Sequence, residues 1–384
     1  YAGSIVSTSI LSFVYSYGAP RYLHSFPTRR SSDLQASKNG RRKLHEMSLL
    51  DDSDSQYTMH PRRDSSCYIN FGTNPCSEII LRPYQFCNLT EVVVRPTDSE
   101  KSLTRKVKLA TILGTIQSTY TNMPYLRPVW RKNTEEERLL GVSLTGIMDN
   151  EITSKPTTKL LNKLRHIAVQ TNNHLAQQLG ISASAAITCV KPSGTVSQLV
   201  DSASGIHARH SDYYIRTVRG DNKDPLTQFL KDSGIPAEAC VMKPDSTTVF
   251  SFPMKSPSGA ITRTQMNAIE QLELWLTYQR HWCEHKPSVT ISVKENEWMQ
   301  VGAWVYEHFD EVSGISFLPF SEHTYQQAPY QDIDEDSYKE FLTKMPKNVD
   351  WSLLQEFEKE DTTSGGRELA CTAGVCEIVD IEAA

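Results

Sequence analysis

Between residues 79 and 318, short apolar runs alternate with long segments of helical period, and this alternation limits the possible folds more than any other feature of the sequence. The strand-like runs cover residues 79–81, 91–94, 139–148 (where a tight turn is the alternative), 186–190, 288–293 and 315–318. The helical segments cover residues 106–120, 159–179, 262–285 and 295–308, and the first is predicted to turn Val107, Ala110, Leu113 and Ile116 toward the core. Such alternation is typical of parallel strands joined by helical crossovers, so the sequence predicts an α/β fold.

Composition argues against several classes of protein. The chain has 384 residues, 39% of them hydrophobic, which is enough for one large domain or two to three ordinary ones. Its net charge of −5 argues against a general nucleic-acid binder, and no apolar run is long enough to span a membrane. The eight cysteines include no CxxC pair and no zinc-finger spacing, which argues against a disulfide scaffold and a structural metal. We therefore expect a soluble protein of a reducing compartment, the cytoplasm, without nucleic-acid or membrane partners.

The segment NPCSE, residues 74–78, places a thiol between an amide and a carboxylate. In an extended segment Asn74, Cys76 and Glu78 would leave the same face of the chain. A catalytic thiol needs a group that adjusts its protonation or accepts the product of its step, and a second thiol, Cys87, follows eleven residues after Cys76. Taken alone, Glu78 is more often a solvated loop carboxylate and Cys87 a buried, half-apolar residue. The combination favours a redox site.

The segment KPSGTVS, residues 191–197, directly follows a predicted buried strand. Hydroxyl and backbone N–H groups at the start of a helix bind phosphate, because the helix dipole favours an anion there. The candidates are Ser193, Gly194, Thr195 and Ser197. The spacing is not that of a P-loop, and the same residues could merely cap a helix.

Two more cysteines, Cys371 and Cys376, lie within the last fourteen residues, after a Ser-Gly-Gly sequence at 364–366. Two cysteines in a tail of small residues can close a disulfide and reach other thiols by exchange. A metal site built on this pair would need two further ligands. The sequence therefore predicts a mobile tail over residues 364–384 that carries a redox pair.

The first part of the chain reads differently from the rest. Residues 25–34, SFPTRRSSDL, resemble the translation of a sequencing-library adapter, so we expect residues 1–34 to be partly foreign; a basic surface loop is the alternative. Residues 35–66 are polar and charged, which predicts a linker or loop. Near the other end, acidic and aromatic residues with short helical patterns predict a separate segment over residues 326–363.

Together these motifs resemble those of ribonucleotide reductases, specifically the adenosylcobalamin-dependent, monomeric ribonucleoside-triphosphate reductases. The resemblance runs from about residue 71 to the C-terminus and rests on NPCSEI, QFCNLTE, GVSLTGIMD, VKPSGTVS, SGIHARHSDYYIRTVR, GISFLP and CTAGVC. Proline before the central cysteine favours the cobalamin class, because the class that uses a separate radical-generating subunit typically has leucine there. The resemblance implies that residues 67–325 form the second half of a ten-stranded α/β barrel, with Cys76 on a central finger loop.

The resemblance also implies how ribonucleoside triphosphates would be reduced to deoxyribonucleotides. Cys76 would carry a thiyl radical generated with adenosylcobalamin, Glu78 would act as general base on the 3′ hydroxyl, and Asn74 would hold the ribose. Cys87 would be half of the dithiol that reduces the 2′ position. Cys371 and Cys376 would reduce the resulting disulfide and be reduced in turn by thioredoxin or a similar protein. The substrate phosphates would be held by Ser193, Gly194, Thr195, Val196 and Ser197.

Some parts of the family's pattern have no counterpart here. The partner of Cys87, the allosteric nucleotide site and the first half-barrel are expected in an N-terminal part outside this sequence, so we expect the chain to be inactive by itself and the full-length enzyme to be monomeric. Four cysteines receive no family role and are expected to be buried thiols: Cys67, Cys189, Cys240 and Cys283. Two alternatives stay open, namely the large subunit of a metal-dependent ribonucleoside-diphosphate reductase and a non-catalytic, thiol-bearing nucleotide-binding protein.

Overall fold

The computed structural model describes residues 5–7, 72–320 and 326–358, which fall into two compact units. The first unit comprises the described residues up to 209 together with 257–320, and the second comprises 210–256 and 326–358. Cys67, Cys371 and Cys376 lie outside the described residues, as do most of the expected leader and linker. The predictions made for these parts therefore stay predictions.

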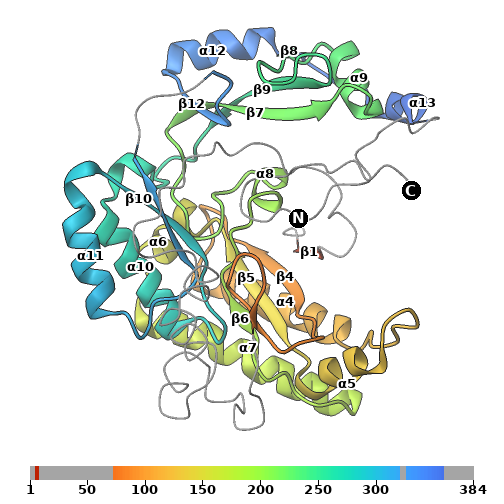
Figure 1. Cartoon of the computed structure of the whole chain (residues 1–384), viewed down its shortest axis with the longest axis vertical. Helices are drawn as coiled ribbons and strands as arrows, with labels where there is room; N and C mark the ends of the chain where they lie inside the picture. Colours follow the sequence, from red (N-terminus) through yellow and green to blue (C-terminus); the bar gives the residue numbers. More distant parts are fainter. Residues whose placement is uncertain (1–4, 8–71, 321–325, 359–384) are drawn as a thin grey trace, which may run out of the picture. The chain divides into compact units, whose positions relative to one another are not determined.

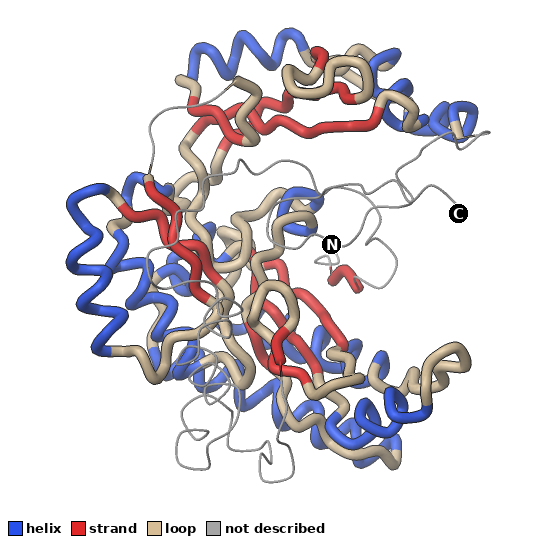
Figure 2. The backbone as a smooth tube through the Cα atoms, in the orientation of Figure 1, coloured by secondary structure: helices blue, strands red, loops and turns tan. Residues whose placement is uncertain are grey.

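A sheet of mainly parallel strands forms the centre of the first unit (Figures 1 and 2). Strands β4 (Asn88–Val93), β5 (Leu140–Thr145) and β6 (Thr188–Cys189) are parallel neighbours, and β1 (Ile5–Ser7) pairs antiparallel with the other edge of β4. A parallel bridge between Val190 and Pro287 leads on to β10 (Val289–Val293), which pairs in parallel with β11 (Ile315–Pro319). The predicted α/β class is confirmed.

Helices connect these strands. Helices α4 (Glu100–Gln117) and α5 (Pro128–Glu137) lie between β4 and β5 in the chain, and α7 (Thr158–Leu179) lies between β5 and β6. Helix α10 (Ala268–His281) precedes β10, and α11 (Trp298–Glu307) joins β10 to β11. The shorter elements are η1 (Ile147–Asp149), α6 (Glu151–Ser154), α8 (Val196–Leu199), η2 (Arg263–Gln265) and η3 (Glu295–Glu297). Helix α7 ends at Gly180, whose left-handed backbone (φ 65°) is the stop that the glycine predicted.

The core of the first unit lies between the sheet and its helices. Val92 on β4 and Val142 on β5 belong to one apolar cluster with Leu103, Val107 and Ala110 of α4. The prediction that Leu113 and Ile116 also face this core is wrong, because they are 39% and 43% exposed. The buried stripe of α4 continues instead through Thr111, Gly114 and Thr115, and these small residues let the helix approach β5 closely.

The second unit contains a four-stranded antiparallel sheet in the order β12 (Tyr330–Asp332), β7 (Tyr213–Asp221), β9 (Thr247–Lys255) and β8 (Ala237–Ala239). Helix α9 (Pro225–Asp232) follows β7 in the chain, and α12 (Glu335–Lys344), η4 (Trp351–Leu353) and α13 (Leu354–Phe357) follow β12. The pattern of apolar residues did not single out this sheet. The sequence-predicted site residues that the structure describes all lie in the first unit.

Candidate active site

The NPCSE motif forms the turn of a small hairpin. Strands β2 (Gly72–Thr73) and β3 (Ile80–Leu81) pair antiparallel, and Asn74 and Ile79 close the turn between them. The Asn74 N–H donates to the Ile79 carbonyl at 3.1 Å, and the Asn74 side-chain Oδ1 accepts from the Ile79 N–H at 3.0 Å. Asn74 therefore shapes the hairpin locally, and its amide nitrogen is the part of the side chain that can donate to a ligand.

Cys76 and Glu78 lie in opposite environments, although only Ser77 separates them. Cys76 is exposed, whereas Glu78 has no exposed surface. The expectation of an extended segment is wrong, because Ser77 adopts a left-handed backbone (φ 63°) and turns the chain. The N–H of Lys286 donates to the Glu78 carbonyl at 3.0 Å and ties the hairpin to the segment before β10. Glu78 is thus not a solvated loop carboxylate.

A lysine that the sequence analysis did not single out as a site residue pairs with this buried carboxylate. The Lys191 Nζ donates to Glu78 Oε1 at 2.8 Å, while Glu78 Oε2 is buried without a hydrogen-bond partner among the described residues. Burial opposes the charge on Lys191, but the neighbouring Glu78 carboxylate outweighs it and raises the pKa of Lys191 above its ordinary value. Because Lys191 begins the KPSGTVS segment, this ion pair joins the two main motifs.

The thiols lie around the same ion pair. Cys76 and Cys189 both act electrostatically on Lys191, and Cys189 in turn is within reach of Glu78 and Cys87. A Cβ placed on Gly141 would lie 3.4 Å from the sulfurs of both Cys87 and Cys189, so the two thiols approach each other over this glycine. Cys189 is fully buried, which raises the pKa of its thiol. It is a buried thiol as expected, but one beside Cys87.

The KPSGTVS loop turns only part of its polar surface outward. Gly194 and Thr195 are exposed, and the Thr195 side chain makes no capping hydrogen bond to α8, so simple helix capping does not account for it. Ser193 is buried in a left-handed conformation (φ 52°), and its hydroxyl is a hydrogen-bonding neighbour of the buried Glu91 carboxyl group. Ser197 is buried with its hydroxyl 2.7 Å from that of Ser204, which holds the loop together.

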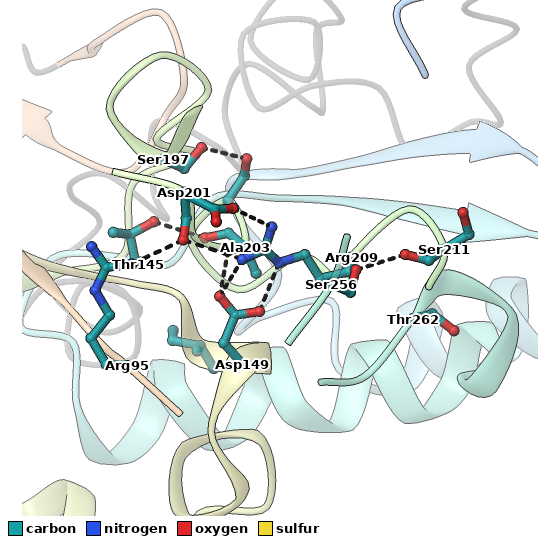
Figure 3. A network of polar contacts seen from close by, with 12 residues as sticks. Arg95, Thr145, Asp149, Ser197, Asp201, Ala203, Arg209, Ser211, Ser256 and Thr262 are labelled. Atoms are coloured by element: carbon teal, nitrogen blue, oxygen red, sulfur yellow. Dashed lines mark hydrogen bonds and ion pairs between the residues drawn. The ribbon is translucent and has the colours of Figure 1, made fainter. Parts of the chain in front are cut away.

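A buried arginine anchors the chain that follows this loop (Figure 3). The Arg209 guanidinium donates to Asp149 Oδ1 at 2.8 Å and to Asp149 Oδ2 at 2.9 Å, and it also contacts Asp201 Oδ1 at 3.1 Å. The Ala203 N–H donates to Asp149 Oδ2 at 2.8 Å, and Arg95 donates to the Asp201 carbonyl at 2.9 Å. This network fixes residues 201–209 to the turn after β5.

Glu91 is a second buried carboxyl group that the sequence analysis missed. It is 4% exposed, and the Ser193 hydroxyl is its hydrogen-bonding neighbour. Burial raises the pKa of Glu91, and neighbouring Ser193 and Lys191 offset part of that rise. A signal was present in the sequence, because Glu91 lies four residues after Cys87 and alternate residues of a strand share a face.

The described residues contain no group of three or more His, Cys, Asp and Glu side chains placed to hold a metal ion. Within the same ranges, no helix is both long enough and apolar enough to cross a membrane.

Comparisons with known proteins show which folds and sequences this chain resembles. No protein-family model matches the chain. A crystal structure of a B12-dependent (class II) ribonucleotide reductase superposes with a TM-score of 0.64 at 26% sequence identity, over 75% of this chain and 44% of that chain. The fold of the described residues is therefore that of part of a ribonucleotide reductase.

The relatives in sequence narrow the resemblance further. The adenosylcobalamin-dependent ribonucleoside-triphosphate reductase of Lactobacillus leichmannii is 27% identical over 345 residues, which cover 80% of this chain and 45% of that protein. The enzyme of the same name from Euglena gracilis is 29% identical over 313 residues, covering 79% of this chain and 42% of that protein. The resemblance to adenosylcobalamin-dependent ribonucleoside-triphosphate reductases is confirmed, and the chain spans less than half the length of these relatives.

Proposed function

We propose that this chain carries the catalytic hairpin and phosphate loop of an enzyme that reduces ribonucleoside triphosphates to 2′-deoxyribonucleoside triphosphates, with adenosylcobalamin as cofactor. One observation supports the proposal above all: the NPCSE, QFCN and KPSGT segments meet around the Glu78–Lys191 ion pair. The KPSGT segment lies more than 100 residues after the other two, and together the three bring the groups that radical reduction of a nucleotide needs, namely a thiol, a base, a second thiol and a phosphate loop.

The hairpin residues divide the chemistry between them. Cys76 is the exposed thiol and fits a bulky cofactor, because it is open to the surface, as Pro75 is, while Ser77 and Glu78 after it are buried. When bound, adenosylcobalamin supplies the radical chemistry. Glu78 holds the proton of the 3′ hydroxyl on Oε2, since Oε1 is occupied by Lys191. Asn74 orients the ribose through its amide nitrogen.

The remaining motifs supply reducing equivalents and substrate binding. Cys87 is one thiol of the reducing pair, and Cys371 and Cys376 pass electrons to it from thioredoxin or a similar protein. Ser193, Gly194, Thr195, Val196 and Ser197 form the phosphate loop, in which Gly194 and Thr195 are the outward-facing members. We place the full-length enzyme in the cytoplasm as a monomer, with residues 67–325 as the second half of its ten-stranded barrel and Cys76 on its finger loop.

The experiment that tests this function is tritium exchange from the 5′ position of adenosylcobalamin, measured on a protein that joins this chain to an upstream half. We expect exchange in the parent protein and none in Cys76→Ser, with or without added reductant. Turnover that needs an added radical-generating subunit, without cobalamin-dependent exchange, would instead support the metal-dependent reductase. Nucleotide binding without exchange or turnover would support the non-catalytic alternative.

A second measurement addresses the terminal cysteines. In the same full-length protein, Cys371→Ser should keep turnover with a small dithiol and lose it with thioredoxin, because only the large reductant needs a shuttle. Cys240→Ser is the matched control, since Cys240 lies in the second unit and outside the proposed chemistry. Equal loss with both reductants in Cys371→Ser would show that the tail is not a shuttle.

A further inference from the structure

One row of side chains crosses three strands beneath the phosphate loop. The register pairs Glu91 on β4 with Ser143 on β5, and Ser143 with Cys189 on β6. Cys87 lies four residues before Glu91 and therefore shares its face, whereas Val92 and Val142 are on the opposite face, in the core. Glu91 thus belongs to the face of the sheet that carries the thiols.

Lys191 and Ser193 bring the phosphate loop against this row. The Lys191 N–H donates to Ser143 Oγ at 2.9 Å, so the start of the loop is bonded to the middle of the row. Glu78 Oε2 is buried without a hydrogen-bond partner among the described residues, while the Ser193 hydroxyl of the loop is a hydrogen-bonding neighbour of the Glu91 carboxyl group. An unpaired buried oxygen is costly, so this cluster of two carboxyl groups indicates a place where a proton or a ligand is held.

The balance of charge among Glu78, Glu91 and Lys191 determines which carboxyl group binds a proton. If both carboxyl groups were ionised, one ammonium would have to balance two carboxylates in a buried site, which is unfavourable. Lys191 Nζ is bonded to Glu78 at 2.8 Å and acts on Glu91 only through space, so Glu91 is the carboxyl group on which we place the proton. The direction of the Glu91 pKa agrees, since burial raises it despite Lys191 and Ser193. The charged group that acts on Glu91 is Lys191, the thiols of Cys87 and Cys189 lie on the same face of the sheet, and the residue of β1 paired with Glu91 is Val6.

We infer that Glu91 is a further acid–base group of this site, one that holds a proton beside the Glu78–Lys191 ion pair and thereby makes the phosphate loop fit to bind an anion. An ionised Glu91 would repel a phosphate placed beside Ser193, whereas a neutral carboxylic acid offers an O–H donor to it. Phosphate binding at the loop is therefore coupled to retention of the proton on Glu91. The assignment of a nucleotide phosphate rests on the function proposed above, but the protonation of Glu91 does not.

Infrared spectroscopy of the 384-residue chain tests the protonation directly. The carbonyl stretch of a protonated carboxyl group should be present at neutral pH, and Glu91→Gln should remove it. Glu137→Gln is the matched control, because Glu137 is also buried but is paired with Arg82 at 3.3 Å, so it should remove no such band. A spectrum in which Glu91→Gln changes no carboxylic-acid band would overturn the inference, whatever the enzyme's activity proves to be.

Binding of inorganic tripolyphosphate to the same chain tests the coupling. The affinity of the parent should fall relative to that of Glu91→Gln as the pH rises from about 5 to 8, because only the parent loses a proton from Glu91. Lys191→Met should weaken binding at every pH. Parallel pH profiles for the parent and Glu91→Gln would refute the coupling. A failure of nucleotide reduction in the full-length protein would leave both measurements unaffected, so the two proposals can fail separately.

Discussion

Two ionic clusters of the first unit, one around Arg209 and one around Glu78, differ in how completely their buried carboxylates are hydrogen-bonded. In one, Arg209 and Asp149 are 4% and 3% exposed, and both carboxylate oxygens of Asp149 accept hydrogen bonds. In the other, Glu78 pairs with Lys191 through one oxygen only, and Glu78 Oε2 has no hydrogen-bond partner among the described residues. Both clusters include residues that flank the phosphate loop in the sequence.

This difference in hydrogen bonding distinguishes a structural ion pair from a candidate reactive site. A buried ion pair with every hydrogen bond made rigidifies its surroundings, while its charges have nothing left to offer a ligand. A buried pair with free oxygens keeps the desolvation cost of those atoms, and such sites persist where a proton or substrate completes them. The Arg209 cluster accordingly holds residues 201–209 in place, and the Glu78 cluster is the one to which we assign the proposed chemistry.

The largest expected effect comes from breaking the satisfied cluster. Arg209→Met leaves the Asp149 carboxylate buried without its cation, and we expect a loss of about 3–5 kcal/mol in unfolding free energy. Lys191→Met is the matched comparison and should cost less than half as much, because the Lys191 side chain is 26% exposed and its ion pair is partly screened by water. Urea unfolding of the two variants at neutral pH measures the difference. Equal losses would mean that the two clusters are alike in kind.

A smaller effect is expected from Lys286, a buried lysine of this unit. It follows His285 in the segment whose backbone is hydrogen-bonded to the hairpin. Burial lowers the pKa of Lys286 from 10.5 to about 7. Between these two values the unfolded chain binds more protons than the folded one, so stability should rise with pH. We expect a rise of about 1–2 kcal/mol between roughly pH 7 and 8.5, measured by urea unfolding relative to Lys286→Met. Parallel pH profiles would show that Lys286 is charged in the folded state.

The sequence was a good guide to elements whose signals are local. Helix α7 carries its stop signal in Gly180, and β5 is a continuous buried run, so both could be predicted without knowledge of their neighbours. Helix α4 shows the limit of such patterns. Its sequence offers an apolar stripe through Leu113 and a small-residue stripe through Gly114, and only the closeness of β5 decides that the second is buried.

The site was predictable where a motif is contiguous and not where register creates it. Cys76 and Glu78 were found from five consecutive residues, but their opposite exposure depends on the left-handed backbone of Ser77. Lys191 and Glu91 are ordinary charged residues in sequence. They become site residues because the alignment of β4, β5 and β6 places them on the face of the thiols, and this alignment is a non-local property.

The smallest expected effect concerns His207, which lies two residues before Arg209. Its ring is held by hydrogen bonds rather than by an ion pair. Its Nε2 accepts from the Thr290 N–H at 2.9 Å, so the proton is on Nδ1, which donates to the Ser204 carbonyl at 2.8 Å. Burial lowers the pKa of His207 below its ordinary value of 6.5, although the bond to Ser204 opposes this. The unfolded chain therefore binds more protons just below pH 6.5, and stability should fall as the pH is lowered from there. We expect a loss of less than about 1 kcal/mol between roughly pH 6.5 and 5.5 relative to His207→Gln, measured by urea unfolding.

Such a loss would show that His207 resembles the Arg209 cluster, in which every hydrogen-bond donor and acceptor is already in use, because protonation of the ring would break an existing hydrogen bond. If the parent and the His207→Gln variant show the same pH dependence of stability, protonation of His207 costs no stability. The contact with Thr290 would then not depend on a neutral His207 ring.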